Sequence, residues 1–283
     1  MIHEHIKQVA KFVDEDEFQV ILPDELSHDN EFFEDGDGID PQWVQYYWRM
    51  MFNLKIRASK INVKEGDLIL DACCGQGFLG EYFSGLGGKV IFCDLSPLQL
   101  NSLTHRFSEI EKKAHTVLAD LLDLPFPDNY FDYVVGNSFL HHLPNVPKGL
   151  NELKRVLKKD GVLILFHEPS EKANYWETFP LSIIKDTTYN TGYTDLWQFD
   201  TSKLDKLFIK CGFEKPQIIG SGLLSAIFLN WYFILMNKLG IQNAIMIKPA
   251  LNLRLFFYRI EKPLRKIVKT NQFPSIFIST RKS

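Results

Sequence analysis

The sequence predicts an α/β protein with a doubly wound, Rossmann-like, mostly parallel sheet. Short apolar runs alternate with segments of helical periodicity between residues 68 and 166. Several of these runs end in an acidic residue, which places the acids at the carboxyl ends of the strands. Ligands bind at that edge in sheets of this kind. The pattern therefore predicts both the architecture and the position of a ligand site.

The first strand, turn and helix lie between Leu68 and Phe83. The apolar run ends at Asp71, the turn runs from Cys73 to Gly77, and helical periodicity follows. Glycines let the backbone approach a ligand closely, and the N-terminus of the following helix attracts an anion. The segment predicts a nucleotide-type or carboxylate-bearing cofactor. A turn whose glycines serve only the fold is the alternative.

The later elements follow in the order that a doubly wound sheet requires. The second strand ends in an acid about twenty residues after the first, where a partner for ribose hydroxyls is expected. In chain order the sequence predicts strands ending at Asp94 and Asp120, a strand at Tyr133–Val135, a helix from about Pro147 to Lys159 that stops at Gly161, a fifth strand at Val162–Phe166, and a helix near Ser202–Cys211.

Composition indicates one globular enzyme domain with additions. The chain has 283 residues, of which 45% are hydrophobic and 24% charged. Its cysteines form no CxxC pair and have no histidines at zinc spacing, which predicts a reduced, cytoplasmic protein without a metal site. The segment MIHEHIKQVAKF lacks the apolar core of a signal peptide.

Charge is unevenly distributed, although the net charge is only −3. Acids dominate residues 1–45, and lysines and arginines dominate the last forty residues. Such asymmetry is typical of a tail that meets an anionic partner. Two solvated surfaces that attract each other are the alternative. No nucleic-acid-binding signature is present in the sequence, so no nucleic acid partner is expected.

Five segments together resemble a known family. They are LDACCGQG, CDLSP, LPFPDNYFDYVV, FLHHL and ELKRVLKKDGVLILFHEP. In this order they are similar to class I S-adenosylmethionine-dependent methyltransferases of the ubiquinone and menaquinone methyltransferase branch. The resemblance covers Leu54–Ser221 and adds an antiparallel seventh strand at Ser275–Thr280. Cys73 replaces the first glycine of the family's turn. Together with Phe78, it argues against an NAD-type site.

The resemblance implies that S-adenosylmethionine is the cofactor and suggests which residues bind it. Asp71 would hold the amino end, directly or through the turn backbone, and Asp94 would accept hydrogen bonds from the ribose hydroxyls. Leu95 would pack against the adenine, whose amino group Asp120 and Leu121 would read. For each acid, capping the following helix is the alternative. The expected cofactor-binding residues are Asp71, Cys73, Gly75, Gly77, Asp94, Leu95, Asp120, Leu121 and Asn137.

Three residues are candidates for proton transfer or for orienting the acceptor. His141 and His142 follow the fourth strand, and histidine suits general-base work because its pKa lies near neutrality. Adjacent residues of a helix point in different directions, so one of the two is expected to face the substrate, and His141 is favoured. Glu168, at the end of the fifth strand, is the third candidate. Helix capping is its alternative role.

The remaining segments divide the chain into four predicted parts. Residues 1–53 form an acidic segment and a helix that begins at Asp40 and covers the cofactor or simply packs. Residues 54–221 form the cofactor-binding core, with an aromatic substrate-lid insertion at 169–199. Residues 222–273 form an apolar and basic helical insertion, and 274–283 the last strand. The face Leu251, Leu255, Tyr258 and Lys262 fits contact with an anionic membrane. A helical pair packed on the sheet or in a dimer is the alternative.

These features together predict a methyltransferase that acts on a small, lipophilic or lipid-linked acceptor by O- or C-methylation. Two other classes of function remain open. One is a catalytically silent protein that binds S-adenosylmethionine and acts as an interaction or regulatory module. The other is a methyltransferase that acts on RNA or protein. The predicted location is cytoplasmic, with peripheral contact to a membrane as a further expectation for residues 223–269.

Overall fold

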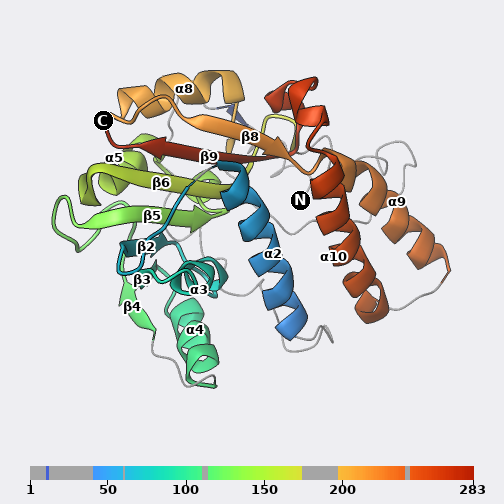
Figure 1. Ribbon diagram of the computed structural model, residues 1–283, viewed down its shortest axis with the longest axis horizontal. Coiled ribbons are helices and arrows are strands. Elements are labelled where there is room, and N and C mark those ends of the chain that lie inside the picture. Colours follow the sequence, from blue (N-terminus) through green and yellow to red (C-terminus); the bar gives the residue numbers. More distant parts are fainter. Residues whose placement is uncertain (1–10, 13–40, 60, 110–113, 174–196, 240–242) are drawn as a thin grey trace.

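A seven-stranded sheet forms the centre of the molecule (Figure 1), with strand order β4-β3-β2-β5-β6-β9-β8. The computed structural model describes residues 11–12, 41–59, 61–109, 114–173, 197–239 and 243–283. The strands of the sheet are β2 (Leu68–Ala72), β3 (Lys89–Asp94), β4 (His115–Leu118), β5 (Phe131–Asn137), β6 (Leu157–Pro169), β8 (Gln217–Ser221) and β9 (Ser275–Arg281).

The strand directions confirm the predicted fold class. Strands β4, β3, β2, β5 and β6 pair in parallel. Strand β9 pairs antiparallel with both β6 and β8, and it corresponds to the last strand predicted at Ser275–Thr280. A separate two-stranded sheet joins β1 (Lys11–Phe12) to β7 (Trp197–Gln198). The rest of the predicted N-terminal acidic segment before Pro41 lies outside the described residues.

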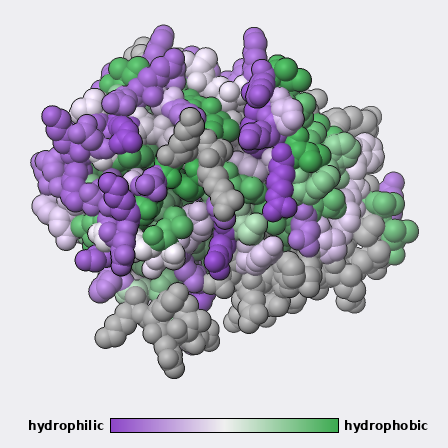
Figure 2. All heavy atoms as spheres, viewed as in Figure 1, coloured by the Kyte–Doolittle hydropathy of each residue, from purple (hydrophilic) through white to green (hydrophobic). Residues whose placement is uncertain are grey.

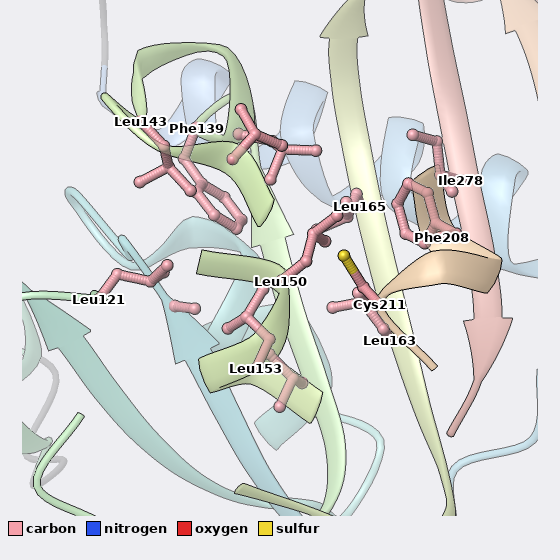
Figure 3. Close-up of a cluster of buried hydrophobic side chains, with 14 of the residues drawn as sticks. Leu121, Phe139, Leu143, Leu150, Leu153, Leu163, Leu165, Phe208, Cys211 and Ile278 are labelled. Carbon is pink, nitrogen blue, oxygen red and sulfur yellow. The ribbon is translucent and has the colours of Figure 1, made fainter. Parts of the chain in front are cut away.

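Helices cover both faces of the sheet because its strands are apolar on both sides. Along β6, Leu163 and Leu165 face one cluster, while Ile164 and Phe166 face the other. Helices α5 (Val146–Val156) and α8 (Thr201–Lys210) cover the first face, and Figure 3 shows Leu150, Leu153, Phe208 and Cys211 packed against strand residues there. The other face carries α2 (Pro41–Ser59), α3 (Phe78–Ser84) and α4 (Pro97–Glu109).

The predicted end of one helix was wrong. Helix α5 begins near the expected position, where the Asn145 side chain accepts a hydrogen bond from the backbone N–H of Lys148. It ends at Val156 rather than Lys159. Leu157 is already extended and pairs with Phe131, so strand β6 starts earlier than the predicted fifth strand. Long-range pairing with β5 thus replaces the last helical turn that local periodicity favours.

The insertion between β8 and β9 forms two packed helices, α9 (Leu223–Lys238) and α10 (Asn243–Ile260), followed by short turns η3 (Leu264–Lys266) and η4 (Thr270–Gln272). Leu255 and Tyr258 of α10 are buried against Met51 of α2, and Leu251 packs partly against them. The face singled out in the sequence is therefore an internal contact. No helix in the described part of the chain is long and apolar enough to cross a membrane.

Candidate active site

The turn after β2 is held in left-handed backbone conformations. The φ angles are 51° at Cys73, 50° at Gly75 and 74° at Gly77. A Cβ at Gly77 would come within 2.4 Å of the Leu103 side chain, so this position needs glycine for packing as well. A Cβ at Gly75 would meet nothing within 4 Å. The backbone at Gly75 therefore borders open space, as a turn that receives a ligand requires.

Asp71 is buried beneath this turn. Its Oδ2 accepts a hydrogen bond of 2.8 Å from the backbone N–H of Gly80, in the first turn of α3. Burial raises the pKa of Asp71 well above its usual value, and the charge of Asp94 adds to this, while the Gly80 hydrogen bond acts in the opposite direction. Asp71 thus ties the turn to the helix. This arrangement favours an indirect role in cofactor binding, through the backbone.

Asp94 lies at the end of β3 beside the same turn. Its Oδ2 accepts a hydrogen bond of 2.8 Å from the Gly75 N–H, and its Oδ1 accepts one of 2.9 Å from the Ser96 N–H. The Ser96 hydroxyl, in turn, accepts from the N–H of Gln99 at the start of α4. Ser96 therefore caps α4. A carboxylate at this position is an acceptor of the kind that hydroxyl donors bind.

The residues expected around the adenine differ in exposure. The Leu95 side chain is 59% exposed next to Asp94, where it can cover a flat apolar ring. Asp120 is exposed, and its Oδ1 accepts a hydrogen bond from the N–H of Leu122. Leu121 is buried in the hydrophobic core, so only its backbone faces a ligand from this position. The structure brings Leu95 and Asp120 to the carboxyl edges of adjacent strands β3 and β4.

Glu168 and His141 form a buried pair at the ends of β6 and β5. Oε2 of Glu168 lies 2.8 Å from Nδ1 of His141, and both side chains are almost completely buried. The carboxylate also accepts hydrogen bonds from the backbone N–H groups of Phe139, Leu140 and His141. These contacts fill the acceptor sites of Glu168. The geometry favours Glu168 as an orienting group that fixes the imidazole of His141.

His142 lies beside this pair in η2 (Leu140–His142). Its ring centroid is 4.0 Å from that of His141, with the planes tilted by 45°. The structure therefore brings both predicted histidines close to Glu168. Of the two imidazole rings, that of His141 contacts the carboxylate. Strands β2, β5 and β6 are neighbours and run parallel, so the pair and the cofactor turn lie at the same carboxyl edge of the sheet.

His167 was missed by the sequence reasoning. Its Nδ1 lies 2.7 Å from Oδ1 of Asn137, and the Trp48 ring of α2 packs edge-on against it at 5.3 Å. The sequence feature that could have identified His167 is its position directly before the candidate residue Glu168. Strand alternation alone gives the wrong direction for the side chain, because the register of β6 against β9 shifts between Leu165 and Glu168.

The aromatic lid predicted for residues 169–199 falls largely outside the described residues. Tyr175, Trp176, Phe179, Tyr189 and Tyr193 all lie there. Trp197 is described, and it is buried in the core, where its indole N–H donates to the carbonyl of Leu143. Among the described residues, no group of three His, Cys, Asp or Glu side chains is placed to hold a metal ion.

The residues present fit S-adenosylmethionine. The open space at Gly75 leaves room against the turn, Asp94 presents acceptors for two ribose hydroxyls, and Leu95 offers an exposed apolar surface for the adenine. The N-terminus of α3 faces the same turn and favours the negative end of a ligand. The carboxyl edge of β2 and β3 thus carries an acceptor, an exposed apolar side chain and open space at Gly75 that suit this cofactor.

Comparisons with known proteins agree with this geometry. A family model described as a methyltransferase domain matches residues 70–165. The 2-phytyl-1,4-naphtoquinone methyltransferase of Synechocystis sp. is 30% identical over 51% of this chain and 64% of its own length, and that of Trichormus variabilis is 30% identical over 55% and 71%. A solved structure of geranyl diphosphate methyltransferase in complex with GPP and sinefungin covers 83% of this chain and 77% of its own, with a TM-score of 0.54 and 17% identity.

The fold and the turn define a Rossmann-like methyltransferase domain. The chain belongs to the class I S-adenosylmethionine-dependent methyltransferases, in the branch that contains the quinone methyltransferases. The match to the Synechocystis relative leaves out more than a third of that protein, and the family model ends at residue 165, before the helical insertion between β8 and β9. Acceptor choice is therefore argued from the site itself.

Proposed function

We propose that this protein transfers the methyl group of S-adenosylmethionine to a lipophilic, quinone-type acceptor. The observation that carries the proposal is the buried His141–Glu168 pair, which lies at the same strand edge as the cofactor turn. The two relatives are 2-phytyl-1,4-naphtoquinone methyltransferases, which supports the acceptor class. The substrate test below separates this proposal from a silent cofactor-binding protein and from a methyltransferase that acts on RNA or protein.

The chain's own residues would supply orientation and a proton acceptor. Bound S-adenosylmethionine provides an electrophilic methyl on a sulfonium, and transfer leaves the electron pair of the broken bond on sulfur. A carboxylate accepts hydrogen bonds, so Glu168 fixes the imidazole of His141 through Nδ1, and a neutral imidazole held in this way is suited to general-base work on the acceptor. The turn at Gly75 and the carboxylate of Asp94 would fix the cofactor, and such positioning contributes several kcal/mol to catalysis.

Cofactor binding is tested by isothermal titration of the wild type, Asp94→Ala and Asp123→Ala with S-adenosylmethionine. We expect micromolar affinity for the wild type, about −8 kcal/mol, and a loss of about tenfold or more for Asp94→Ala. Asp123 is exposed in the turn that follows β4 and serves as the matched control. Equal affinity in all three proteins would refute the ribose role of Asp94. Tight binding of NADH would contradict the cofactor assignment.

The acceptor is tested by incubating the enzyme with labelled S-adenosylmethionine and a prenylated 1,4-naphthohydroquinone, kept anaerobic. We expect methylated product that depends on His141, with His141→Ala slower by about 100-fold. Total RNA and a protein mixture serve as competing substrates. Label in either of these, with none in the naphthohydroquinone, would move the protein to the alternative class.

Contact with an anionic membrane through α9 and α10 is part of the proposal. Phe228, Trp231 and Leu235 recur at helical spacing along α9, and Leu239 follows its last residue; the four residues are between 47% and 61% exposed. Figure 2 shows hydrophobic residues beside hydrophilic ones at this end of the molecule. Five exposed residues between Arg254 and Lys269 are basic, and they alternate with the exposed apolar residues Phe256, Ile260 and Ile267: Arg254, Arg259, Lys262, Lys266 and Lys269.

The acid in this region does not offset the basic charge. Glu261 is fully buried, where it accepts hydrogen bonds from the N–H groups of Gly222 and Leu224 and pairs with Arg265. An exposed apolar stripe with basic neighbours fits the interface of an anionic bilayer, to which each basic residue contributes about 1 kcal/mol. A lipophilic acceptor dissolved in that bilayer would then lie within reach of the enzyme.

Membrane contact is tested by co-sedimentation with phosphatidylcholine vesicles, with and without phosphatidylserine. We expect binding that needs phosphatidylserine, weakens with salt and falls in the double variant Trp231→Ser, Leu235→Ser. Ile209→Ser on α8 is the control, because Ile209 is as exposed as Leu235 but lies on another helix. Unchanged binding of the double variant would exclude the α9 stripe as the contact surface.

A further inference from the structure

Strand β6 ends in an irregularity that redirects one side chain. The pairing of β6 with β9 shifts between Leu165 and Glu168, and His167 within this shift has a φ of 57°. Left-handed backbone at a histidine is unfavourable, by about 1–3 kcal/mol, and such strain concentrates at functional sites. Bulges next to active sites re-aim side chains. The neighbouring strand β5 is followed by a second strained residue, Ser138, with a φ of 59°.

The imidazole of His167 is fixed in one orientation. Asn137 Oδ1 accepts a hydrogen bond of 2.7 Å from its Nδ1, so Nδ1 carries the proton and Nε2 keeps its lone pair. Two residues of α2 hold the ring from the other side, Trp48 at 5.3 Å and Phe52 at 6.4 Å between centroids. Within the described part of the chain, Nε2 has no hydrogen-bond partner. The side chain is only partly buried.

The surroundings keep this ring neutral. Burial lowers the pKa of His167 well below its usual value of 6.5, and the charges of Lys55 on α2 and Arg254 on α10 lower it further. A neutral imidazole whose Nδ1–H is already used has one function left, which is to accept a hydrogen bond at Nε2. His167 also directly precedes Glu168, so this acceptor is adjacent in sequence to the His141–Glu168 pair at the carboxyl edge of the sheet.

We infer that Nε2 of His167 accepts a hydrogen bond from a hydroxyl group of the methyl acceptor, and that Asn137 is the residue that positions the ring for this contact. The inference rests on the proposed methyl-transfer function and deepens it, since it names a residue that determines specificity. A hydroxyl can donate to Nε2, whereas a quinone carbonyl can only accept. His167 therefore selects the hydroxyl-bearing form of an acceptor ring over its carbonyl form.

The experiment compares 1,4-naphthohydroquinone with 1,4-naphthoquinone, each titrated anaerobically into enzyme saturated with S-adenosylhomocysteine. The variant is His167→Asn, because asparagine tolerates left-handed backbone and retains a polar group near Asn137 while Nε2 is lost. His115→Asn is the matched control, since His115 is exposed on strand β4 at the sheet edge. Affinity for S-adenosylhomocysteine is measured for all three proteins, which separates acceptor binding from cofactor binding.

The wild type and His115→Asn should bind the hydroquinone about tenfold more tightly than the quinone. His167→Asn should lose this preference at unchanged affinity for S-adenosylhomocysteine. Nitrogen-15 NMR of the wild type provides a second readout that does not depend on the folding of a variant: the Nε2 resonance of His167 should shift when the hydroquinone binds.

Two results would overturn the inference in distinguishable ways. If the wild type binds the hydroquinone but the Nε2 resonance does not move and His167→Asn keeps the preference, His167 does not contact the acceptor, while the proposed function stands. If the wild type binds neither ring in the presence of S-adenosylhomocysteine, the proposed acceptor class fails, and the role of His167 fails with it.

Discussion

Oε2 of Glu168 lies 2.8 Å from Nδ1 of His141, so a residue of β6 sets the orientation of a side chain that follows β5. The same carboxylate accepts hydrogen bonds from three backbone N–H groups of the turn that contains His141. Glu168 thus shapes the turn and the imidazole together. A change at Glu168 should affect stability and catalysis at once.

Glu168→Gln should lower both the free energy of unfolding and the rate of methyl transfer. The amide has one acceptor oxygen, so buried N–H groups lose their partner, at about 1–3 kcal/mol in stability. Loss of the carboxylate also frees the His141 ring, and we expect kcat to fall about tenfold or more. Urea denaturation and steady-state kinetics measure the two effects. Glu214→Gln, at an exposed position, should stay within about 0.5 kcal/mol of the wild type.

Gly75→Ala and Gly77→Ala should separate cofactor binding from folding. Both positions have positive φ, which is unfavourable for alanine by about 1–2 kcal/mol. At Gly77 the new methyl also meets Leu103, which adds about 1–3 kcal/mol. At Gly75 the methyl enters the open space proposed for the cofactor. Gly77→Ala should be the less stable variant by thermal melting. In Gly75→Ala, the loss of binding free energy for S-adenosylmethionine should exceed the loss in the free energy of unfolding.

Cys73→Gly should stabilise the protein. Cys73 has a φ of 51°, in the region that glycine occupies readily and other residues avoid. Relief of this strain should raise the free energy of unfolding by about 1–2 kcal/mol. The greater freedom of glycine in the unfolded chain lowers that gain by about 0.5–1 kcal/mol. The midpoint of chemical denaturation should therefore rise slightly. Cys93→Ala, in the adjacent strand without positive φ, should instead lower it. A drop in the midpoint of Cys73→Gly would show that the thiol packs better than its backbone suggests.

Lys55→Met should raise stability at neutral pH, and the gain should shrink toward pH 10.5. Nζ of Lys55 is buried, and it has no hydrogen-bond partner among the residues that the structure describes. Burial, followed by the charges of Arg265 and Arg254, lowers the pKa of Lys55 well below its usual value of 10.5. The unfolded chain therefore binds the proton more tightly than the folded chain.

Wild-type stability consequently rises with pH up to the unfolded pKa of lysine. Removal of this buried amine, which lies 6.0 Å from the Tyr258 ring centroid but forms no hydrogen bond among the described residues, should add about 1–3 kcal/mol near neutrality. Free energies of unfolding across a pH series, for the wild type, Lys55→Met and the exposed control Lys64→Met, measure this. A difference that does not change with pH would mean that Lys55 remains charged in the folded chain.

The sheet and the cofactor edge could be predicted because their signals are local. Apolar runs that end in acids mark strand ends, and all strand ends of a parallel sheet meet at one edge. Asp71 and Asp94 accordingly lie on either side of the predicted turn. The lining of the acceptor side depends on pairing between distant segments. The direction of His167 follows from the register of β6 against β9, which strand alternation does not contain.

The packing of the insertion between β8 and β9 could not be predicted either, because it also depends on contacts between distant segments. Helix α9 is apolar on most sides, so its sequence does not reveal which face another element covers. Helix α10 presents Leu255 and Tyr258 to Met51 of α2, and the exposed stripe is instead the one through Trp231 and Leu235 of α9. The choice of face is made by tertiary packing, which overrides the periodicity of an isolated helix.

Strand β9 is the last strand in chain order, yet it lies inside the sheet between β6 and β8. During synthesis, one edge of β6 stays unpaired until residues more than a hundred positions later have been made. In this sheet, β8 also pairs with no strand other than β9. Closure of such a long loop is slow, and an unpaired edge is open to pairing with other chains. The insertion between β8 and β9 therefore lengthens the time for which this half of the sheet stays unfinished, so assembly of the protein is most vulnerable just before its final strand docks.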